Sequence, residues 1–222
     1  MQETSLHADL KNWYAQPGDL IESAVGGYII DIVRQDLLIE IQTRNFSALK
    51  PKLIRLLDHH PLRLVHSIPQ EKWIVRTDPD GINVLQRRKS PKRGRPENIF
   101  KELAGITNLI KHPNLSIEIL ITREEEIWQD DGLGSWRRKG WSIANRRLLE
   151  VLRTLVLTSA TDYHIFLPAT LPGLFSVRDL ATSLHQYQSL AGRMAYTLHG
   201  IGVIERVDKK GRAWVYRESE VK

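Results

Sequence analysis

Two consecutive apolar strands, each interrupted by a single carboxylate, constrain the fold of this chain more than any other feature. The segments Tyr28–Arg34 and Leu37–Thr43 are rich in Ile, Val and Leu, and a tight turn joins them. In such a hairpin, Asp31 and Glu40 can lie close together across the two strands. Because burying an unpaired carboxylate is costly, each acid requires a basic partner or a metal ion.

The two acids admit two interpretations. Side-chain alternation sends Glu40 and Gln42 to the same face of their strand. Two carboxylates that converge with backbone carbonyls suit Mg²⁺, which can orient a water for attack on a phosphodiester. Alternatively, Asp31 and Glu40 pair with Arg34, Arg44 or another base at the edge of the sheet.

The elements around this hairpin indicate an α/β unit. An apolar residue at every third or fourth position predicts a helix before the hairpin and another after it, and a short apolar run predicts a further strand. These elements are the helices Leu6–Ala15 and Ser47–Asp58 and the strand Leu62–Ile68.

This order of elements, with Asp31 on one strand and Glu40-Ile41-Gln42 on the next, resembles the PD-(D/E)XK nuclease superfamily. That family has the restriction-endonuclease-like fold and includes Holliday-junction resolvases. The resemblance covers about residues 5–70 and implies a mixed sheet flanked by helices. It also implies that Asp31 and Glu40 hold Mg²⁺ or Mn²⁺, that the carbonyl of Ile41 joins them, and that Glu22 assists.

Gln42 departs from the family's pattern, which usually has a lysine at this position. A glutamine carries neither a positive charge nor a titrating amine, although it can position a water by hydrogen bonding. Lys50 or Lys52, on the following helix, would then supply the charge from another place.

The run Arg87–Pro96 holds six basic residues and two prolines, which predicts a loop or linker. Within it, residues 92–96 resemble the core of an AT-hook, because glycine permits close approach to DNA and arginines favour a narrow minor groove. The alternative is a charged loop in which Pro96 begins a helix. Either way, we expect phosphate contacts from Arg87, Arg88, Lys89, Lys92, Arg93 and Arg95.

The remainder of the middle third alternates between strands and helices. We expect a hairpin of Lys72–Thr77 and Ile82–Arg87, helices at Pro96–Lys111 and Ser142–Leu157, and a strand that begins at Ser116 and ends in a solvated acidic patch, residues 124–126. A polar loop between them interleaves tryptophan with basic residues, which favours either nucleic-acid stacking or ordinary packing of the indoles. Its basic residues are Arg137, Arg138 and Lys139.

The last fifty residues predict a helix, a turn, a second helix and a hairpin with a basic tip. Ser176 caps the first helix, Ser189–His199 form the second, and Gly200 ends it. This order resembles the winged-helix family of helix-turn-helix domains, which bind either DNA or other proteins. The DNA interpretation places the second helix in a major groove and the hairpin tip on phosphate. It assigns contacts to Ser189, Arg193, Tyr196, Lys209, Lys210 and Arg212.

The bulk composition agrees with a polyanionic partner. The net charge is +6, the chain has no cysteine, and no stretch approaches a membrane span. We therefore expect a cytoplasmic, nucleoid-associated α/β (α+β) protein that binds duplex or branched DNA. Its expected activity is that of a Mg²⁺-dependent endonuclease acting on phosphodiester bonds in DNA repair, recombination or defence. The alternative is a catalytically inactive DNA-binding or regulatory protein, or a protein adaptor, that uses the same folds. A homodimer would suit two-strand cleavage, although no heptad pattern indicates one. The expected regions are a nuclease-like core (1–86), a basic linker (87–96), an extension (97–170) and a winged helix (171–222).

Overall fold

The computed structural model describes residues 5–219 of the chain, so residues 1–4 and 220–222 of the first and last expected regions lie outside it. Its first part follows the expected order, with one strand that the sequence did not predict, Leu20–Val25. The elements are α1 (Ser5–Tyr14), β1 (Leu20–Val25), β2 (Tyr28–Arg34), β3 (Leu37–Ile41), η1 (Phe46–Leu49) and α2 (Lys50–Leu57).

A mixed sheet of seven strands forms the body of the protein, in the order β1-β2-β3-β4-β6-β7 with β5 paired to β4. β1, β2 and β3 are antiparallel, whereas β4 runs parallel to both β3 and β6. The additional strands are β4 (Leu62–Thr77), β5 (Val84–Lys89), β6 (Leu115–Gln129) and β7 (Ser142–Leu157). The two strands expected at 62–68 and 72–77 are therefore one continuous strand.

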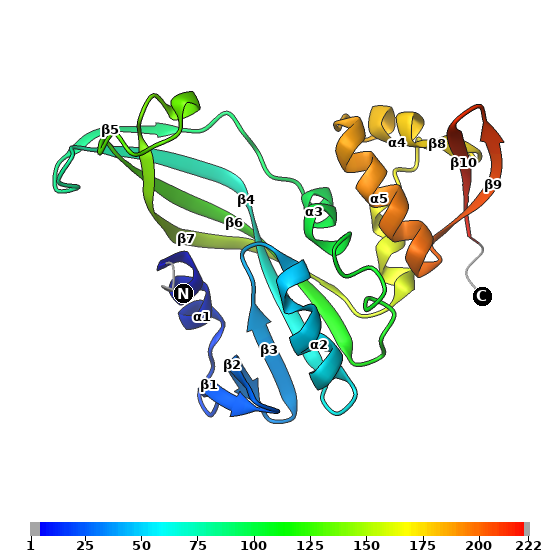
Figure 1. Cartoon of the computed structure of the whole chain (residues 1–222), viewed down its shortest axis with the longest axis horizontal. Coiled ribbons are helices and arrows are strands. Elements are labelled where there is room, and N and C mark those ends of the chain that lie inside the picture. The colour runs from blue at the N-terminus through cyan, green and yellow to red at the C-terminus, as the bar shows by residue number, and fades with distance from the viewer. Residues whose placement is uncertain (1–4, 220–222) are drawn as a thin grey trace.

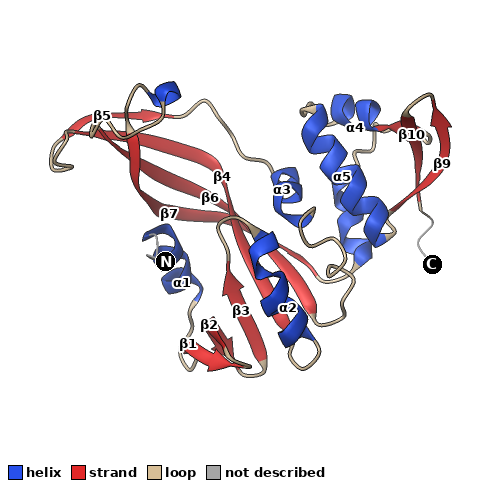
Figure 2. Ribbon diagram, in the orientation of Figure 1, coloured by secondary structure: helices blue, strands red, loops and turns tan. Residues whose placement is uncertain are grey.

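The predicted helix at Ser142–Leu157 is wrong, because these residues form β7 and pair with β6 along almost its whole length. Figure 2 shows it as a strand beside β6. The helix expected at Pro96–Lys111 is much shorter in the structure. The turn η2 (Pro96–Ile99) and helix α3 (Phe100–Leu103) are followed by turns. Strands from the regions 1–86 and 97–170 thus share one sheet.

Helices cover both faces of this sheet near β3 and β4. α1 packs Leu6 and Leu10 against Ile39 and Val65 on one face. On the other face, α2 and α3 bury their apolar residues with the C-terminal elements in a second, larger core. Beyond the helices, the ends of β4, β6 and β7 project with β5 as an arm, at the upper left of Figure 1.

The C-terminal elements form a small helical unit with its own three-stranded sheet in the order β8-β10-β9. They are η4 (Ala160–Phe166), β8 (Phe175–Ser176), α4 (Val177–Ser183), α5 (Gln188–Ile201), β9 (Ile204–Lys210) and β10 (Ala213–Glu218). Ser176 caps α4 as predicted, since its hydroxyl accepts the Asp179 N–H. Leu198 of α5 and Phe100 of α3 belong to one buried cluster, so this unit shares its core with the sheet.

No helix in residues 5–219 is long and apolar enough to cross a membrane.

Candidate functional site

Three carboxylates stand at one register across the first three strands. Glu22 and Asp31 lie between the paired residues Ile21–Ile32 and Ser23–Ile30 of β1 and β2. Asp31 and Glu40 lie one residue beyond the pair Ile32–Ile39 of β2 and β3. The pairing is interrupted here, where Glu22 has a positive φ of 48°. Asp31 and Glu40 lie close together, as predicted, because the Asp31 carboxylate accepts the main-chain N–H of Ile41, the residue after Glu40, at 2.7 Å.

Two of these carboxylates are held by bases of α1. Asp31 Oδ2 lies 3.2 Å from His7 Nε2 and accepts the main-chain N–H of Ile41 at 2.7 Å. Glu22 forms an ion pair with Lys11, whose side chain is almost completely buried. Glu22 lies on β1 and not on the first helix, from which the resemblance led us to expect an acidic residue.

The third carboxylate is held by a base of α2, on the opposite face of the sheet. Lys52 Nζ lies 2.6 Å from Glu40 Oε2 and donates to the carbonyl of Ile29, also at 2.6 Å. Burial raises the pKa of Glu40, the nearby Asp31 raises it further, and Lys52 opposes both effects. The prediction that Lys52 would reach the acids is confirmed in its geometry. Its companion Lys50 instead lines a pocket beside Tyr196.

Arg34 and Arg44, the bases expected for Asp31 and Glu40 in the alternative interpretation, make other contacts. Arg34 pairs with Asp19 at 2.8 Å, and Arg44 supplies its carbonyl to the side-chain amide of Gln42. Gln42 also donates its main-chain N–H to Val65. The main chain of Gln42 therefore extends the pairing of β3 with β4, and its side chain contacts the following loop. Gln42 does not take the place of the usual lysine beside the acids.

In this structure the acids predicted to hold Mg²⁺ or Mn²⁺ are in contact with protein groups. Within residues 5–219, no group of three His, Cys, Asp or Glu side chains could hold a metal ion. Asp31 and Glu40 contact His7 and Lys52 from opposite faces of the sheet, and one oxygen of Asp31 also accepts a main-chain N–H. Glu40 Oε2 lies within ion-pair distance of Lys52 but has no hydrogen-bond partner among the described residues.

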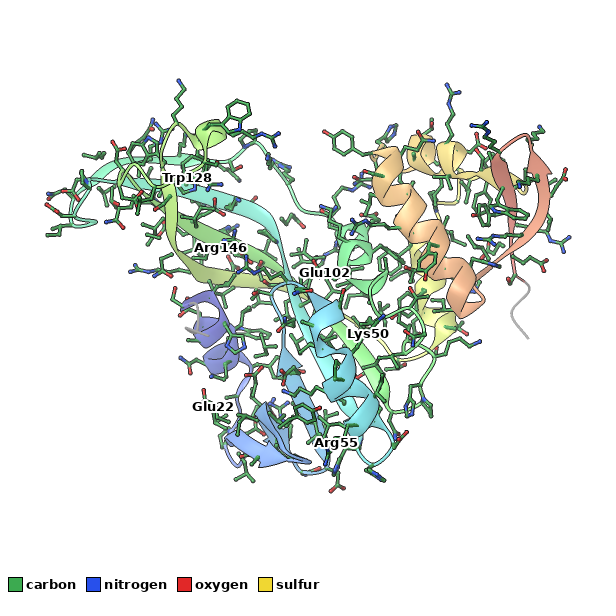
Figure 3. The ribbon with its side chains drawn as sticks, in the orientation of Figure 1. Glu22, Lys50, Arg55, Glu102, Trp128 and Arg146 are labelled. Atoms are coloured by element: carbon green, nitrogen blue, oxygen red, sulfur yellow. The ribbon has the colours of Figure 1, made fainter. Side chains whose placement is uncertain are left out.

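A cleft of about 760 Å³ lies between the middle of β4, the residue Thr43 just after β3, and the first turn of α5. We call it the basic cleft. Four of its lining residues are cationic, namely Lys72, Lys92, Arg93 and Lys101. Its one acidic lining residue, Glu102, accepts the main-chain N–H of Phe46 at 3.1 Å. Figure 3 shows Glu102 at the middle of the molecule, on the side of α2 that faces α5.

A short segment after β5 forms one wall of the basic cleft, and a glycine allows it to lie against β4. The N–H of Gly94 donates to the carbonyl of Pro69 at 2.8 Å, and a Cβ at this position would lie only 2.6 Å from the same oxygen. Arg95 then donates to the carbonyl of Leu184 at 2.7 Å, which ties the segment to the end of α4. At the start of the segment, the N–H of Ser90 donates to the carbonyl of Lys72 at 2.7 Å, so the segment 90–95 is fixed at both ends. Arg87–Lys89, expected in the linker, belong to β5.

A smaller pocket of about 230 Å³ shares Thr43, Ser67 and Lys72 with the basic cleft. Glu124 and Glu126 line it and are only 3% and 4% exposed, so the predicted solvated acidic patch is wrong. Glu126 pairs with Lys72 at 2.9 Å and with Arg146 at 3.4 Å. These ion pairs accommodate Glu126 inside the sheet, whereas Glu124 accepts a hydrogen bond from the hydroxyl of Thr122 at 2.7 Å.

Residues 4–158 match the family described as "Domain of unknown function (DUF8091)", which is more than half of the chain. The chain belongs to the DUF8091 family. An "Uncharacterized protein" of Treponema pallidum (strain Nichols) is 31% identical over 221 residues, which cover 98% of this chain and 86% of that relative. No solved structure matches. The part that matches the family ends before α4, so the DUF8091 match contains the acids and three sides of the basic cleft but not α5.

The remaining predicted DNA contacts of this DUF8091 chain lie at three other places. Arg87, Arg88 and Lys89 are exposed on β5, where Arg87 pairs with Glu125 at 2.9 Å. Arg137, Arg138 and Lys139 lie in the turn between β6 and β7, at the end of the arm. Lys209, Lys210 and Arg212 are exposed at the tip of the β9–β10 hairpin.

On α5, Ser189 lines the basic cleft, Arg193 donates to the carbonyl of Lys101 at 2.8 Å, and Tyr196 is exposed beside another pocket. Sequence reasoning missed His7, Lys11, His66 and Tyr187. The two α1 residues become recognisable only when the packing of that helix on the sheet is known. Tyr187 had a weak local signal, as an aromatic residue next to the expected DNA-binding helix.

Proposed function

We propose that this protein binds DNA, with the basic cleft as the centre of the contact surface. The observation that carries the proposal is the convergence of residues expected to contact DNA from two distant parts of the chain. Lys92 and Arg93, from the basic run, and Ser189, from α5, line the same cleft. Lys101 adds a further positive charge, whereas Lys72 is ion-paired with Glu126. The one lining carboxylate, Glu102, accepts a main-chain N–H.

The shape of the molecule supports a long ligand. Figure 1 shows the end of the arm at the upper left, the β9–β10 hairpin at the upper right, and the segment leading to α3 between them. Exposed cations occur at each of these places. Phosphate contacts of this kind supply most of the affinity of sequence-independent DNA binding.

Two similarities of architecture also support the proposal. Apart from the additional strand β1, the series α1-β2-β3-α2-β4 follows the order of elements on which the restriction-endonuclease-like resemblance rests. The series β8-α4-α5-β9-β10, with β10 between β8 and β9, agrees with the winged-helix resemblance. We propose both as the fold types of the two parts.

Fluorescence anisotropy with a labelled DNA duplex over a range of salt concentrations tests this function. Removing one side chain that neutralises a phosphate should make the slope of log K against log salt less steep by about 0.9. If variant and wild type bind equally at 1 M salt, this change in slope makes the variant bind about 5-fold more weakly than wild type at 0.15 M salt. The double variant Lys92→Ala/Arg93→Ala should therefore bind about 30-fold more weakly, with a slope smaller by about 1.8.

The matched control is Arg55→Ala/Lys111→Ala, which removes the same charge from exposed positions outside the cleft. Figure 3 places Arg55 at the far end of α2. Equal losses of affinity in both double variants would show that net charge alone governs binding, and the cleft would then have no special role.

Metal-dependent DNA cleavage is the second candidate function. One observation favours it: Lys52 Nζ lies 2.6 Å from Glu40, so a lysine does accompany the acidic pair despite Gln42. The test is a cleavage assay on linear, nicked, flapped and four-way DNA with Mg²⁺ or Mn²⁺. Cleavage that disappears in Asp31→Ala would establish it, whereas identical behaviour of wild type and Asp31→Ala would exclude a role for this acid.

A further inference from the structure

Tyr187 is the one aromatic residue that lines the basic cleft beside its cations, and its side chain is 84% exposed. Its backbone is fixed, because it is the N-cap of α5 and its carbonyl accepts the N–H groups of Leu190 and Ala191 at 3.0 and 3.1 Å. A large ring held at a rigid helix start but left uncovered is suited to stacking against another planar group.

His66 lines the cleft with an uncharged ring. His66 Nδ1 lies 2.7 Å from the carbonyl of Gln42, and a carbonyl can only accept, so Nδ1 carries the ring proton. Nε2 is then an acceptor, and burial lowers the pKa of His66, which keeps the ring uncharged. Such an uncharged acceptor suits the polar edge of a base, whereas a phosphate requires the cationic residues of the cleft.

We infer that the basic cleft receives an unpaired nucleotide of DNA, with its base on Tyr187 and its phosphates on Lys92, Arg93 and Lys101. The inference rests on the proposed DNA-binding function and narrows it to DNA that contains unpaired or displaced bases. The cleft volume of about 760 Å³ lies within the range of small-molecule sites, roughly 300–1,000 Å³. A paired base cannot reach such a site, because stacking within the duplex covers both of its faces.

The experiment compares a perfect duplex with the same duplex carrying one unpaired adenine, each measured by anisotropy with the full chain. Wild type should bind the second probe at least about 5-fold more tightly, since stacking of one base on an aromatic side chain contributes about 1–3 kcal/mol. Tyr187→Ala should lose this preference and keep its affinity for the perfect duplex. Tyr187→Phe retains a stacking ring and should keep the preference.

Tyr196→Ala is the matched control, because this tyrosine is exposed on the same helix but lines a different pocket. It should keep the preference. A second measurement replaces the unpaired adenine by 2-aminopurine, whose fluorescence should change on binding to wild type and Tyr187→Phe but not on binding to Tyr187→Ala.

Equal affinity of wild type for both probes would overturn the inference while leaving DNA binding intact. A preference that survives in Tyr187→Ala would also overturn it. Failure to bind either probe in a salt-dependent manner would overturn both the inference and the proposed function.

Discussion

Replacing Lys52 by methionine removes the ammonium group that lies 2.6 Å from the Glu40 carboxylate and retains most of the length of the side chain. Both side chains of the pair are nearly buried, with 12% and 11% of their surface exposed. A buried carboxylate without its partner is strongly unfavourable, so the folded protein will take up a proton on Glu40 in place of the missing charge.

The free energy needed to protonate Glu40 in the folded state sets the size of the expected destabilisation. In the unfolded chain Glu40 has the ordinary pKa of 4.5, which is 2.5 pH units below pH 7. At 1.36 kcal/mol per pH unit, holding the proton in the folded state costs at most about 3.4 kcal/mol at pH 7, and about 0.7 kcal/mol at pH 5. The pKa of Glu40 is raised in the folded state, so stability falls as pH rises above 4.5 and recovers as pH falls.

Urea denaturation of Lys52→Met in EDTA, at pH 7 and at pH 5, measures this effect. The expected decrease in unfolding free energy is large at pH 7 and small at pH 5, and Glu40→Gln in the same chain should restore much of the stability at pH 7. Arg55→Met, on the exposed side of the same helix, should change stability by no more than about 0.5 kcal/mol. A decrease that is equal at both pH values, or that Glu40→Gln does not relieve, would refute the assigned pairing.

The packing around the cleft gives three further predictions. Leu198→Ala should lower the free energy of unfolding by about 2–5 kcal/mol in urea denaturation, because Leu198 is fully buried in the core shared with the sheet. Gly94→Ala should displace the segment 90–95, since its Cβ would meet the Pro69 carbonyl, and anisotropy should show weaker DNA binding. Asp179→Ala should cost about 1 kcal/mol at neutral pH by removing part of the α4 cap. Because hydrogen bonds from Ser176 lower the pKa of Asp179, that difference should disappear in thermal melts as pH falls below 3.8.

The sequence predicted the hairpin of β2 and β3 because its information is local. Alternation of apolar residues, a tight turn and two isolated acids identify both strands and bring Asp31 and Glu40 together. The same applies to α4, whose capping residues lie next to one another in the sequence. Lys52 was identified as a candidate base because α2 follows β3 directly.

β7 could not be predicted in this way. Its apolar residues also fit a helix, and it forms a strand because the long edge of β6 requires a partner for its backbone groups. The register shifts in three places, which disturbs the period of two on which strand prediction depends. Long-range packing likewise decides that His7 contacts Asp31, from 24 residues away.

Chemical footprinting of lysines tests the central claim that DNA lies in the basic cleft. The chain is treated with an amine-acetylating reagent with and without bound DNA, and acetylation is quantified at each lysine by mass spectrometry. Lys92 and Lys101, both exposed in the free protein, should become protected by DNA, whereas the exposed Lys111 should react equally in both states. DNA binding that leaves Lys92 and Lys101 as reactive as Lys111 would contradict the account.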